Sequence, residues 1–194
     1  MIAYLSGKFS YKTPAMVYVD VNGVGYEVNI SLNTYTQIQS LNEGKLFTYL
    51  QVKEDAHTLY GFFDAVEKEM FVLLISVSGV GAATARMMLS SMKPDDITNA
   101  IVMKHISALE SVKGIGRKTA ERLVLELKDK VSKLSVSSPG LISVDNTLEQ
   151  DALNALVALG ISRPVAEQSI KKILISEPSI SNLEILIKKA LKAI

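Results

Sequence analysis

Two short glycine motifs have the residue types and the spacing to bind a phosphate backbone. Gly79-Val80-Gly81 and Gly114-Ile115-Gly116 each lie between segments whose apolar residues recur at helical spacing. Glycine lets the backbone approach a phosphate closely, and the free N–H groups at the start of the next helix favour an anion. A loop of this kind contacts phosphates and carries no base-specific information. The motifs therefore predict sequence-independent binding to a nucleic acid.

An internal repeat contains both motifs. Residues 74–89 and 109–124 align without a gap at an offset of 35, with identical residues at the glycines and at several flanking positions. Each copy resembles the helix-hairpin-helix motif of proteins that bind DNA without sequence preference. Val80 and Ile115 are expected to turn inward and hold each hairpin against its helices. One such motif is often only a tight turn between helices, but two aligned copies favour a binding role.

The second copy carries more positive charge beside its loop than the first. Its expected contacts with phosphate lie at the start of the following helix: Arg117, Lys118, Thr119 and Arg122. The first copy has Ala82 and Ala83 at the positions that match Arg117 and Lys118, and only Arg86 is a cation close by. We therefore expect the second hairpin to bind phosphate more strongly.

The distribution of charge supports a phosphate-binding surface in the middle of the chain. The net charge of the 194 residues is only +1, which by itself argues against a nucleic-acid partner. Residues 1–64 have a net charge of −2, residues 65–134 of +3 and residues 135–194 of 0. The basic region is therefore the one that contains both hairpins.

The residues before the repeat are predicted to form a small barrel. Alternating apolar and polar residues indicate five antiparallel strands, at residues 1–9, 16–21, 26–30, 46–52 and 58–62. The sequence Asn22-Gly23-Val24-Gly25 is a strong hairpin signal between the second and third strands. Five such strands suit a closed barrel of the OB type, although an open meander would show the same pattern. Glu54 and Asp55 then lie near the tip of a second hairpin.

The rest of the chain is predicted to be helical. We expect a multidomain β and α fold in four parts: an OB-like barrel over residues 1–64, a tandem helix-hairpin-helix domain over 65–134, a flexible linker over 135–147 and a three-helix domain over 148–194. In the last part the helices are expected at 148–159, 164–175 and 182–193. Gly160 suits a helix end, Pro164 a first helical position and Ser181 an N-cap.

This order of domains, at this length, resembles the RuvA family. Three strings carry the resemblance, one in each folded domain: residues 53–62, 113–123 and 155–160. The resemblance implies a homotetramer, or two tetramers face to face as an octamer, that holds a four-way Holliday junction open. It also implies a RuvB-type ATPase motor and a RuvC-type resolvase as partners, in recombination and in the repair of DNA damage during the SOS response.

The resemblance also assigns roles to single residues. It implies that Glu54 and Asp55 form an acidic pin, whose charges repel phosphates and help to guide strands apart. Two acidic residues at a hairpin tip are by themselves usually only a solvated turn. The hairpin glycines, Val80 and Ile115 carry over as DNA-binding residues together with the cations beside them. The family often has a lysine near Ala83, and this sequence has none there.

In the last domain four apolar residues match positions at which the family contacts its motor: Leu156, Leu159, Ile161 and Leu191. The alternative is that they form the core of a very small domain, and for Leu156 we favour that alternative. An apolar patch on so small a domain could also be divided between core and partner. Ile161 stands where the family often has an aromatic residue, so the contact there is expected to be weaker or reshaped.

The sequence does not favour an enzyme, although helix-hairpin-helix motifs also occur in DNA glycosylases and nucleases. It has no Walker-type phosphate loop, so the ATPase is expected in the partner. It has no cysteine, and His57 and His105 stand apart from other candidate ligands. We therefore expect a non-catalytic subunit with no cofactor and no metal site.

Two further alternatives concern single-stranded nucleic acid and the membrane. A general single-strand or RNA-binding module would need a basic, aromatic-rich barrel face, whereas residues 1–64 are net negative. Residues 1–9 do not resemble a secretory signal, and the apolar stretch at 70–83 is interrupted by serines and glycines. We expect a cytoplasmic protein that makes no contact with a membrane.

Overall fold

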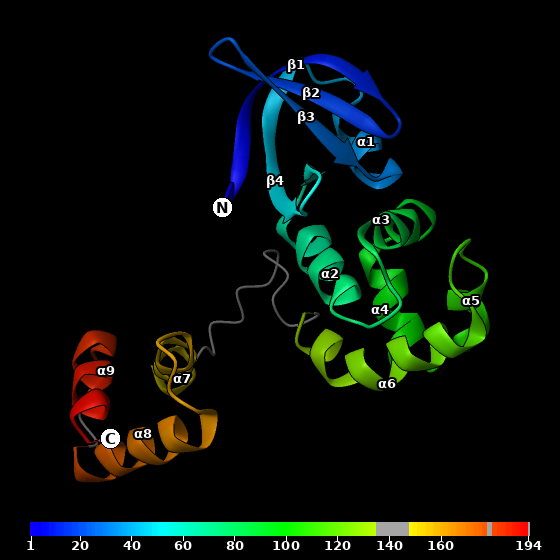
Figure 1. Ribbon diagram of the computed structural model, residues 1–194. Helices are drawn as coiled ribbons and strands as arrows, with labels where there is room; N and C mark the ends of the chain where they lie inside the picture. The colour runs from blue at the N-terminus through cyan, green and yellow to red at the C-terminus, as the bar shows by residue number, and fades with distance from the viewer. Residues whose placement is uncertain (135–147, 178–179, 194) are drawn as a thin grey trace. The chain divides into compact units, whose positions relative to one another are not determined.

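The computed structural model describes residues 1–134, 148–177 and 180–193. The chain divides into two compact units, one up to Ser138 and one from Pro139 to the end (Figure 1). The first unit contains a barrel and a helical domain, and the second contains three helices. The linker expected over residues 135–147 lies outside the described residues.

The first part of the chain is a closed five-stranded barrel, as predicted. Its strands are β1 (Tyr4–Thr13), β2 (Met16–Val21), β3 (Val24–Ile30), β4 (Glu43–Val52) and β5 (His57–Phe62), in the order β1-β2-β3-β5-β4. The prediction that all pairs are antiparallel was wrong in one place, because β3 and β5 pair in parallel and close the barrel. An unpredicted helix, α1 (Leu32–Ile38), follows β3, and the next strand, β4, pairs with β1 and β5 rather than with β3.

The turn between β2 and β3 shows why the barrel was predictable. Asn22 and Gly23 have φ angles of 51° and 88°, which fit the two-residue turns that join antiparallel strands. The N–H of Gly23 donates to the Asp20 carboxylate at 2.9 Å. Val21 then pairs directly with Val24, so β3 begins two residues earlier than the sequence pattern predicted. The local residue choice therefore fixes the register of this hairpin.

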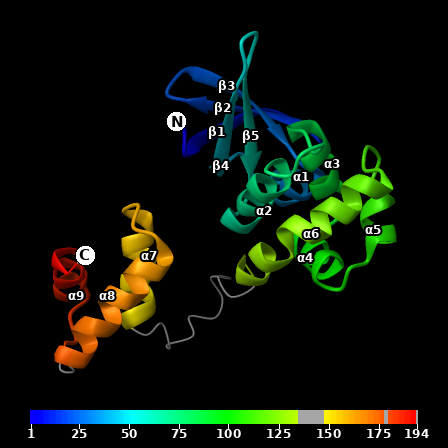
Figure 2. The ribbon, with the colours of Figure 1, turned by 60° about the horizontal axis from the view of Figure 1, so that its bottom comes forward.

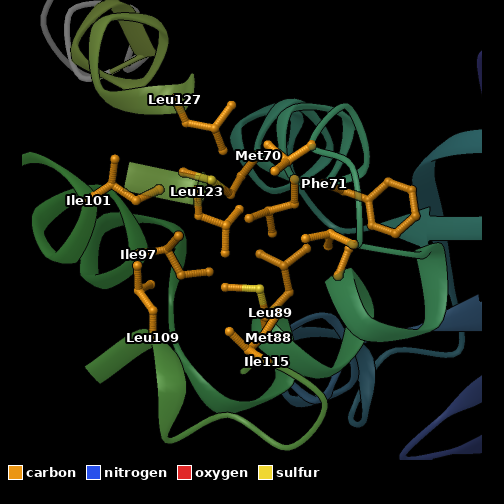
Figure 3. Close-up of a cluster of buried hydrophobic side chains, with 14 of the residues drawn as sticks. Met70, Phe71, Met88, Leu89, Ile97, Ile101, Leu109, Ile115, Leu123 and Leu127 are labelled. Carbon is orange, nitrogen blue, oxygen red and sulfur yellow. The ribbon is translucent and has the colours of Figure 1, made fainter. Parts of the chain in front are cut away.

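Five helices follow the barrel within the first unit: α2 (Ala65–Ile75), α3 (Ala82–Ser91), α4 (Pro94–Val102), α5 (Ile106–Glu110) and α6 (Arg117–Leu134). Their apolar faces meet in one core, and Figure 3 shows Met70, Met88, Ile97, Leu123 and Leu127 from four of them pointing toward one another. All five of these side chains are fully buried. This packing holds the two segments of the repeat in one domain.

The second unit consists of α7 (Leu148–Ala158), α8 (Arg163–Ser176) and α9 (Leu183–Lys192), which confirms the predicted three-helix domain. Gly160 has a φ of 92°, the left-handed conformation that commonly ends a helix. The predicted N-cap Ser181 was wrong by one residue. Asn182 caps α9 instead, because its side-chain oxygen accepts a hydrogen bond from the Ile185 N–H at 3.2 Å. In the described part of the chain, no helix is long and apolar enough to cross a membrane.

Candidate nucleic-acid interface

The two glycine loops of the repeat have the same backbone geometry. Gly79 and Gly114 have φ angles of 94° and 96°, in the region that glycine adopts more easily than other residues. In each loop the middle residue donates its N–H to a carbonyl three residues earlier, at 3.0 Å. Val80 and Ile115 are each 5% exposed and pack in the helical core, as predicted. The repeat in sequence is therefore a repeat in structure.

The second glycine of each loop lies at the start of a helix and faces open space. Gly81 is the N-cap of α3 and makes no side-chain capping bond, and α6 begins directly after Gly116. The first N–H groups of a helix have no partner within that helix. A Cβ added to Gly81 or to Gly116 would meet no atom within 4 Å beyond its chain neighbours. Both helix starts therefore leave room for a close approach by an anion.

The two hairpins lie against each other in a reciprocal way. A Cβ added to Gly79 would lie 3.7 Å from the Thr119 hydroxyl oxygen, and one added to Gly114 would lie 3.6 Å from the Thr84 methyl carbon. Thr119 is in the first turn of α6, and Thr84 is in the first turn of α3. Each loop is thus beside the start of the other copy's helix, so the two helix N-termini lie side by side.

The cations of the second copy are on the surface next to its loop. Arg117 pairs with Glu121 at 3.2 Å across one helical turn. Lys118 is exposed, and its ammonium group has no ion pair with any of the residues that the structure describes. Lys118 is therefore a cation of the second hairpin that an incoming phosphate can use without displacing a carboxylate.

Arg122 connects the two hairpins. Its Nη1 donates to the carbonyl oxygen of Ser78 at 3.1 Å, directly before Gly79 of the first loop. Its Nε lies 3.6 Å from a Glu126 carboxylate oxygen, and half of its side chain remains exposed. A cation of the second copy thus lies beside the first loop, which has none of its own at this edge.

Arg86, the only cation predicted for the first hairpin, faces the barrel. Its Nη1 donates to the Ala15 carbonyl at 3.0 Å and to the Asn29 side-chain oxygen at 2.8 Å. Ala15 lies in the turn between β1 and β2, and Asn29 lies in β3. The structure therefore engages Arg86 in a contact between the barrel and α3 and does not bring it to the glycine loop.

Sequence reasoning missed one cation at the second loop. Lys113 precedes Gly114 directly and is exposed. In the alignment of the two copies it occupies the place of Ser78, the residue whose carbonyl Arg122 contacts. The alignment itself contained the signal, because a charged residue replaces a small polar one at the edge of the loop.

The two acidic residues predicted as a pin lie at the tip of the β4–β5 hairpin. Glu54 and Asp55 are both exposed there, and the Lys53 N–H donates to the Ala56 carbonyl at 2.9 Å to close the turn. Figure 2 shows this hairpin projecting beyond the other strands of the barrel. The two acidic side chains are therefore exposed to solvent and to an approaching strand.

The four apolar residues considered for partner contact differ in exposure. Leu156 is fully buried in the core of the three-helix unit and offers no surface. Leu159 is 63% exposed and Leu191 is 42% exposed. Ile161 is partly buried and packs against the same core. Only Leu159 and Leu191 among the four present a large apolar surface.

The fold and the paired loops define the class of protein: a tandem helix-hairpin-helix domain that follows a small β-barrel. Three family models match the chain, described as RuvA N terminal domain at residues 1–61, SAM-like Helix-hairpin-helix tandem at 71–129 and RuvA, C-terminal domain at 147–194.

Full-length relatives give the same result. The chain is 50% identical to a protein of Flavobacterium psychrophilum, 48% to one of Christiangramia forsetii and 46% to one of Cytophaga hutchinsonii. Each alignment covers 99% of both chains, and each relative is named Holliday junction branch migration complex subunit RuvA. The chain therefore belongs to the RuvA family, which confirms the resemblance seen in the sequence.

Proposed function

We propose that this protein binds four-way Holliday junction DNA as a subunit of a branch migration complex. The observation that carries the proposal is the pair of adjacent, open helix N-termini at Gly81 and Gly116. Each open helix start can hold a phosphate, and two of them side by side can hold one DNA backbone at two points. The names of the relatives supply the DNA structure, because they describe a subunit of the Holliday junction branch migration complex.

The proposed contacts follow from the geometry of the two loops. The glycines, Val80 and Ile115 shape the loops, and the helix N–H groups contact the phosphates. Lys118 and Arg122 add positive charge in the second copy, with Arg117, Thr119 and Lys113 at the margin. Contacts of this kind hold the backbone without reading bases. The protein therefore recognises the branched shape of a junction and not its sequence.

Glu54 and Asp55 act as the acidic pin in this proposal. Like charges repel, so exposed carboxylates at the tip of a projecting hairpin push phosphates aside while the hairpins hold them. A homotetramer places four such tips at the centre of the junction, one for each arm. An octamer of two tetramers is the second assembly that a four-armed substrate fits. Either assembly brings several weak phosphate sites to one DNA molecule.

The energy for branch migration comes from a partner in this proposal. Glycines, threonines and cations hold phosphates without cleaving them, so we assign the ATPase to a RuvB-type motor. Leu159 and Leu191 are the exposed apolar residues for the contact with that motor. A RuvC-type resolvase acts on the same junction. In this proposal the protein and its partners act in the cytoplasm. No catalytic residue and no cofactor is assigned to this chain.

A competition experiment tests the proposal. A labelled four-way junction bound to the protein is challenged with unlabelled junction, linear duplex or single strand of equal length. We expect the unlabelled junction to compete far better than either of the others. Equal competition by duplex would leave only general DNA binding, and better competition by single strand would favour a single-strand-binding module.

A truncation tests the division of labour. Removal of residues 148–194 should leave junction binding nearly intact and abolish branch migration by the added motor. Loss of junction binding with the oligomer preserved would contradict the assignment of the phosphate contacts to the first unit.

A further inference from the structure

A buried carboxylate lies between the barrel and the helical domain. Glu67, in the first turn of α2, is only 2% exposed. It accepts hydrogen bonds from the hydroxyl groups of Ser31 and Thr34, the second at 2.5 Å. Ser31 and Thr34 belong to the start of α1, which follows the barrel strand β3. The carboxylate thus joins an element of the barrel to an element of the hairpin domain.

The two hydroxyl groups that contact Glu67 also accept backbone hydrogen bonds. The Ser31 hydroxyl accepts the Thr34 N–H, and the Thr34 hydroxyl accepts the Phe63 N–H, both at 3.0 Å. Each hydroxyl has one hydrogen, which points to Glu67. A carboxylate can accept one hydroxyl hydrogen at each of its two oxygens, whereas an amide has only one oxygen.

Burial of the Glu67 carboxylate costs free energy of desolvation, which its hydrogen bonds offset in part. Burial raises the pKa of the Glu67 carboxyl, the hydrogen bonds from Ser31 and Thr34 oppose the rise, and the nearby Asp64 adds to it. The N-cap of α2 is supplied by Asp64, whose carboxylate accepts the Glu67 N–H at 2.7 Å. An apolar side chain would fill the space without the desolvation penalty. Because Asp64 supplies the cap, the Glu67 side chain can accept from Ser31 and Thr34 across the domain boundary, and its place in the first turn of α2 also suits a negative charge.

Further directional bonds surround Glu67 at the same boundary. Asn33 donates to the carbonyls of Leu89 and Met92, at 2.5 and 3.1 Å, at the end of α3. The Leu32 N–H donates to the Ser90 hydroxyl at 3.1 Å. Arg86, also on α3, contacts Ala15 and Asn29 of the barrel. Because α3 begins at the first glycine loop, these bonds fix the direction of that helix relative to the barrel.

We propose that Glu67, with Ser31, Asn33, Thr34 and Arg86, forms a polar seam that sets the position of the acidic hairpin tip relative to the two glycine loops. Tyr60 and Phe62 of β5 pack against Phe71 of α2 at this boundary, and the hydrogen bonds of the seam add fixed directions to that packing. The seam makes pin and loops one rigid body, and Glu67 is its central positioning residue. The role in opening a junction rests on the proposed function, but the rigidity itself does not.

A distance measurement on the DNA-free protein tests the seam. The chain has no cysteine, so nitroxide labels can be placed at Glu27→Cys on the barrel and Asn99→Cys on α4, both at exposed positions. Labelled chains are mixed with excess unlabelled chain, so that only distances within one chain are measured by pulsed electron paramagnetic resonance. We expect a single narrow distance distribution.

Glu67→Gln should broaden or shift this distribution, because the amide cannot accept from both hydroxyl groups. Glu69→Gln is the matched control, since it removes the same charge from an exposed position of the same helix. Arg86→Lys is the second variant, at a site that is less buried than Glu67. It keeps the positive charge but loses the geometry of the hydrogen bonds that the guanidinium donates to Ala15 and Asn29. Unchanged distributions in both Glu67→Gln and Arg86→Lys would overturn the proposal. If Glu67→Gln does not fold, Arg86→Lys alone decides.

A junction-opening measurement completes the test. Glu67→Gln should bind linear duplex with an unchanged salt dependence and lose most of its preference for the junction over duplex, measured as the ratio of the two dissociation constants. With fluorophores on two arms of the junction, the variant should also open the junction less than the unmodified protein does. Equal loss for duplex and junction would indicate damage to the loops and contradict the positioning role. If the unmodified protein shows no junction preference, the proposed function fails, while the distance measurement still tests the seam.

Discussion

The two hairpins have nearly identical backbones and different surroundings. Gly79 and Gly114 differ by only 2° in φ, and both middle residues are buried to the same degree. The second hairpin offers Lys118 to solvent, while the first has Ala83 at the same place. The cation that the first copy does have, Arg86, contacts the barrel. The comparison teaches that a repeat can keep the geometry of a phosphate site in both copies while only one of them carries its charge.

The largest effect on junction affinity is expected from changes at the second glycine of each loop, where only the backbone contacts the phosphate. Gly116→Val should place a side chain in open space at the start of α6, so the free protein should fold while phosphate approach is blocked. We expect junction affinity to fall by at least about tenfold, the size of one charged hydrogen bond. Gly81→Val is the matched change in the first copy and should cost less. Fluorescence anisotropy with a labelled junction measures both.

A control separates blocked approach from strain. Gly114 has a φ of 96°, so Gly114→Ala should destabilise the fold by about 1–2 kcal/mol even though the nearest atom to its Cβ is at ordinary contact distance. Chemical denaturation should show this loss for Gly114→Ala and not for Gly116→Val. If Gly81→Val weakened binding more than Gly116→Val, the second hairpin would not be the stronger one.

Substitutions at one pair of matching positions, Lys118 and Ala83, should reduce the difference in charge between the two hairpins. Lys118→Ala should weaken binding to every junction sequence alike, and the slope of log affinity against log salt should flatten by about one unit per lost contact. Ala83→Lys should do the opposite in the first copy, because Ala83 is exposed at the matching position. An unchanged slope in Lys118→Ala, or a changed preference between junction sequences, would contradict the phosphate role.

Much of this arrangement was predictable from local sequence. The repeat placed both loops and the inward direction of Val80 and Ile115, because apolar periodicity and glycine position report local conformation directly. The barrel followed from strand alternation and the Asn22-Gly23 turn. The parallel pairing of β3 with β5 was not predictable, because it depends on contacts between strands separated by α1 and β4.

Side-chain contacts between distant segments were the part that sequence could not supply. Arg86 looked like a phosphate ligand because its position in the repeat is close to the loop. Its actual partners, Ala15 and Asn29, are more than 50 residues away in the chain. Glu67 was likewise indistinguishable from an exposed helical glutamate. A long polar side chain finds its partner in the folded protein, and spacing along the chain gives no information on that choice.

A smaller effect is expected at Arg122, where the two copies are connected. Arg122→Ala removes the bond to the Ser78 carbonyl as well as a positive charge. If this cation serves the first loop, its loss should matter less once that loop is already blocked. The cost of Arg122→Ala in affinity should therefore be smaller in a Gly81→Val background than alone, with a coupling of about 0.5–3 kcal/mol. Strict additivity of the two changes would restrict Arg122 to the second hairpin.

The smallest effect is expected at Arg117, an exposed cation of the second copy that is held in an ion pair. Its side chain is 77% exposed and pairs with Glu121, so the carboxylate competes with any phosphate for the same guanidinium. An exposed pair of this kind contributes about 0.3–0.5 kcal/mol to stability, which denaturation will barely resolve. Glu121→Gln should nevertheless strengthen junction binding slightly, because it frees Arg117 and removes a negative charge near the loop. The gain should shrink in an Arg117→Ala background, where only the loss of the negative charge remains. If Glu121→Gln gave the same gain with and without Arg117, the pair would not restrain this cation. Lys118, which no carboxylate engages among the described residues, would then owe its larger expected effect to its position alone.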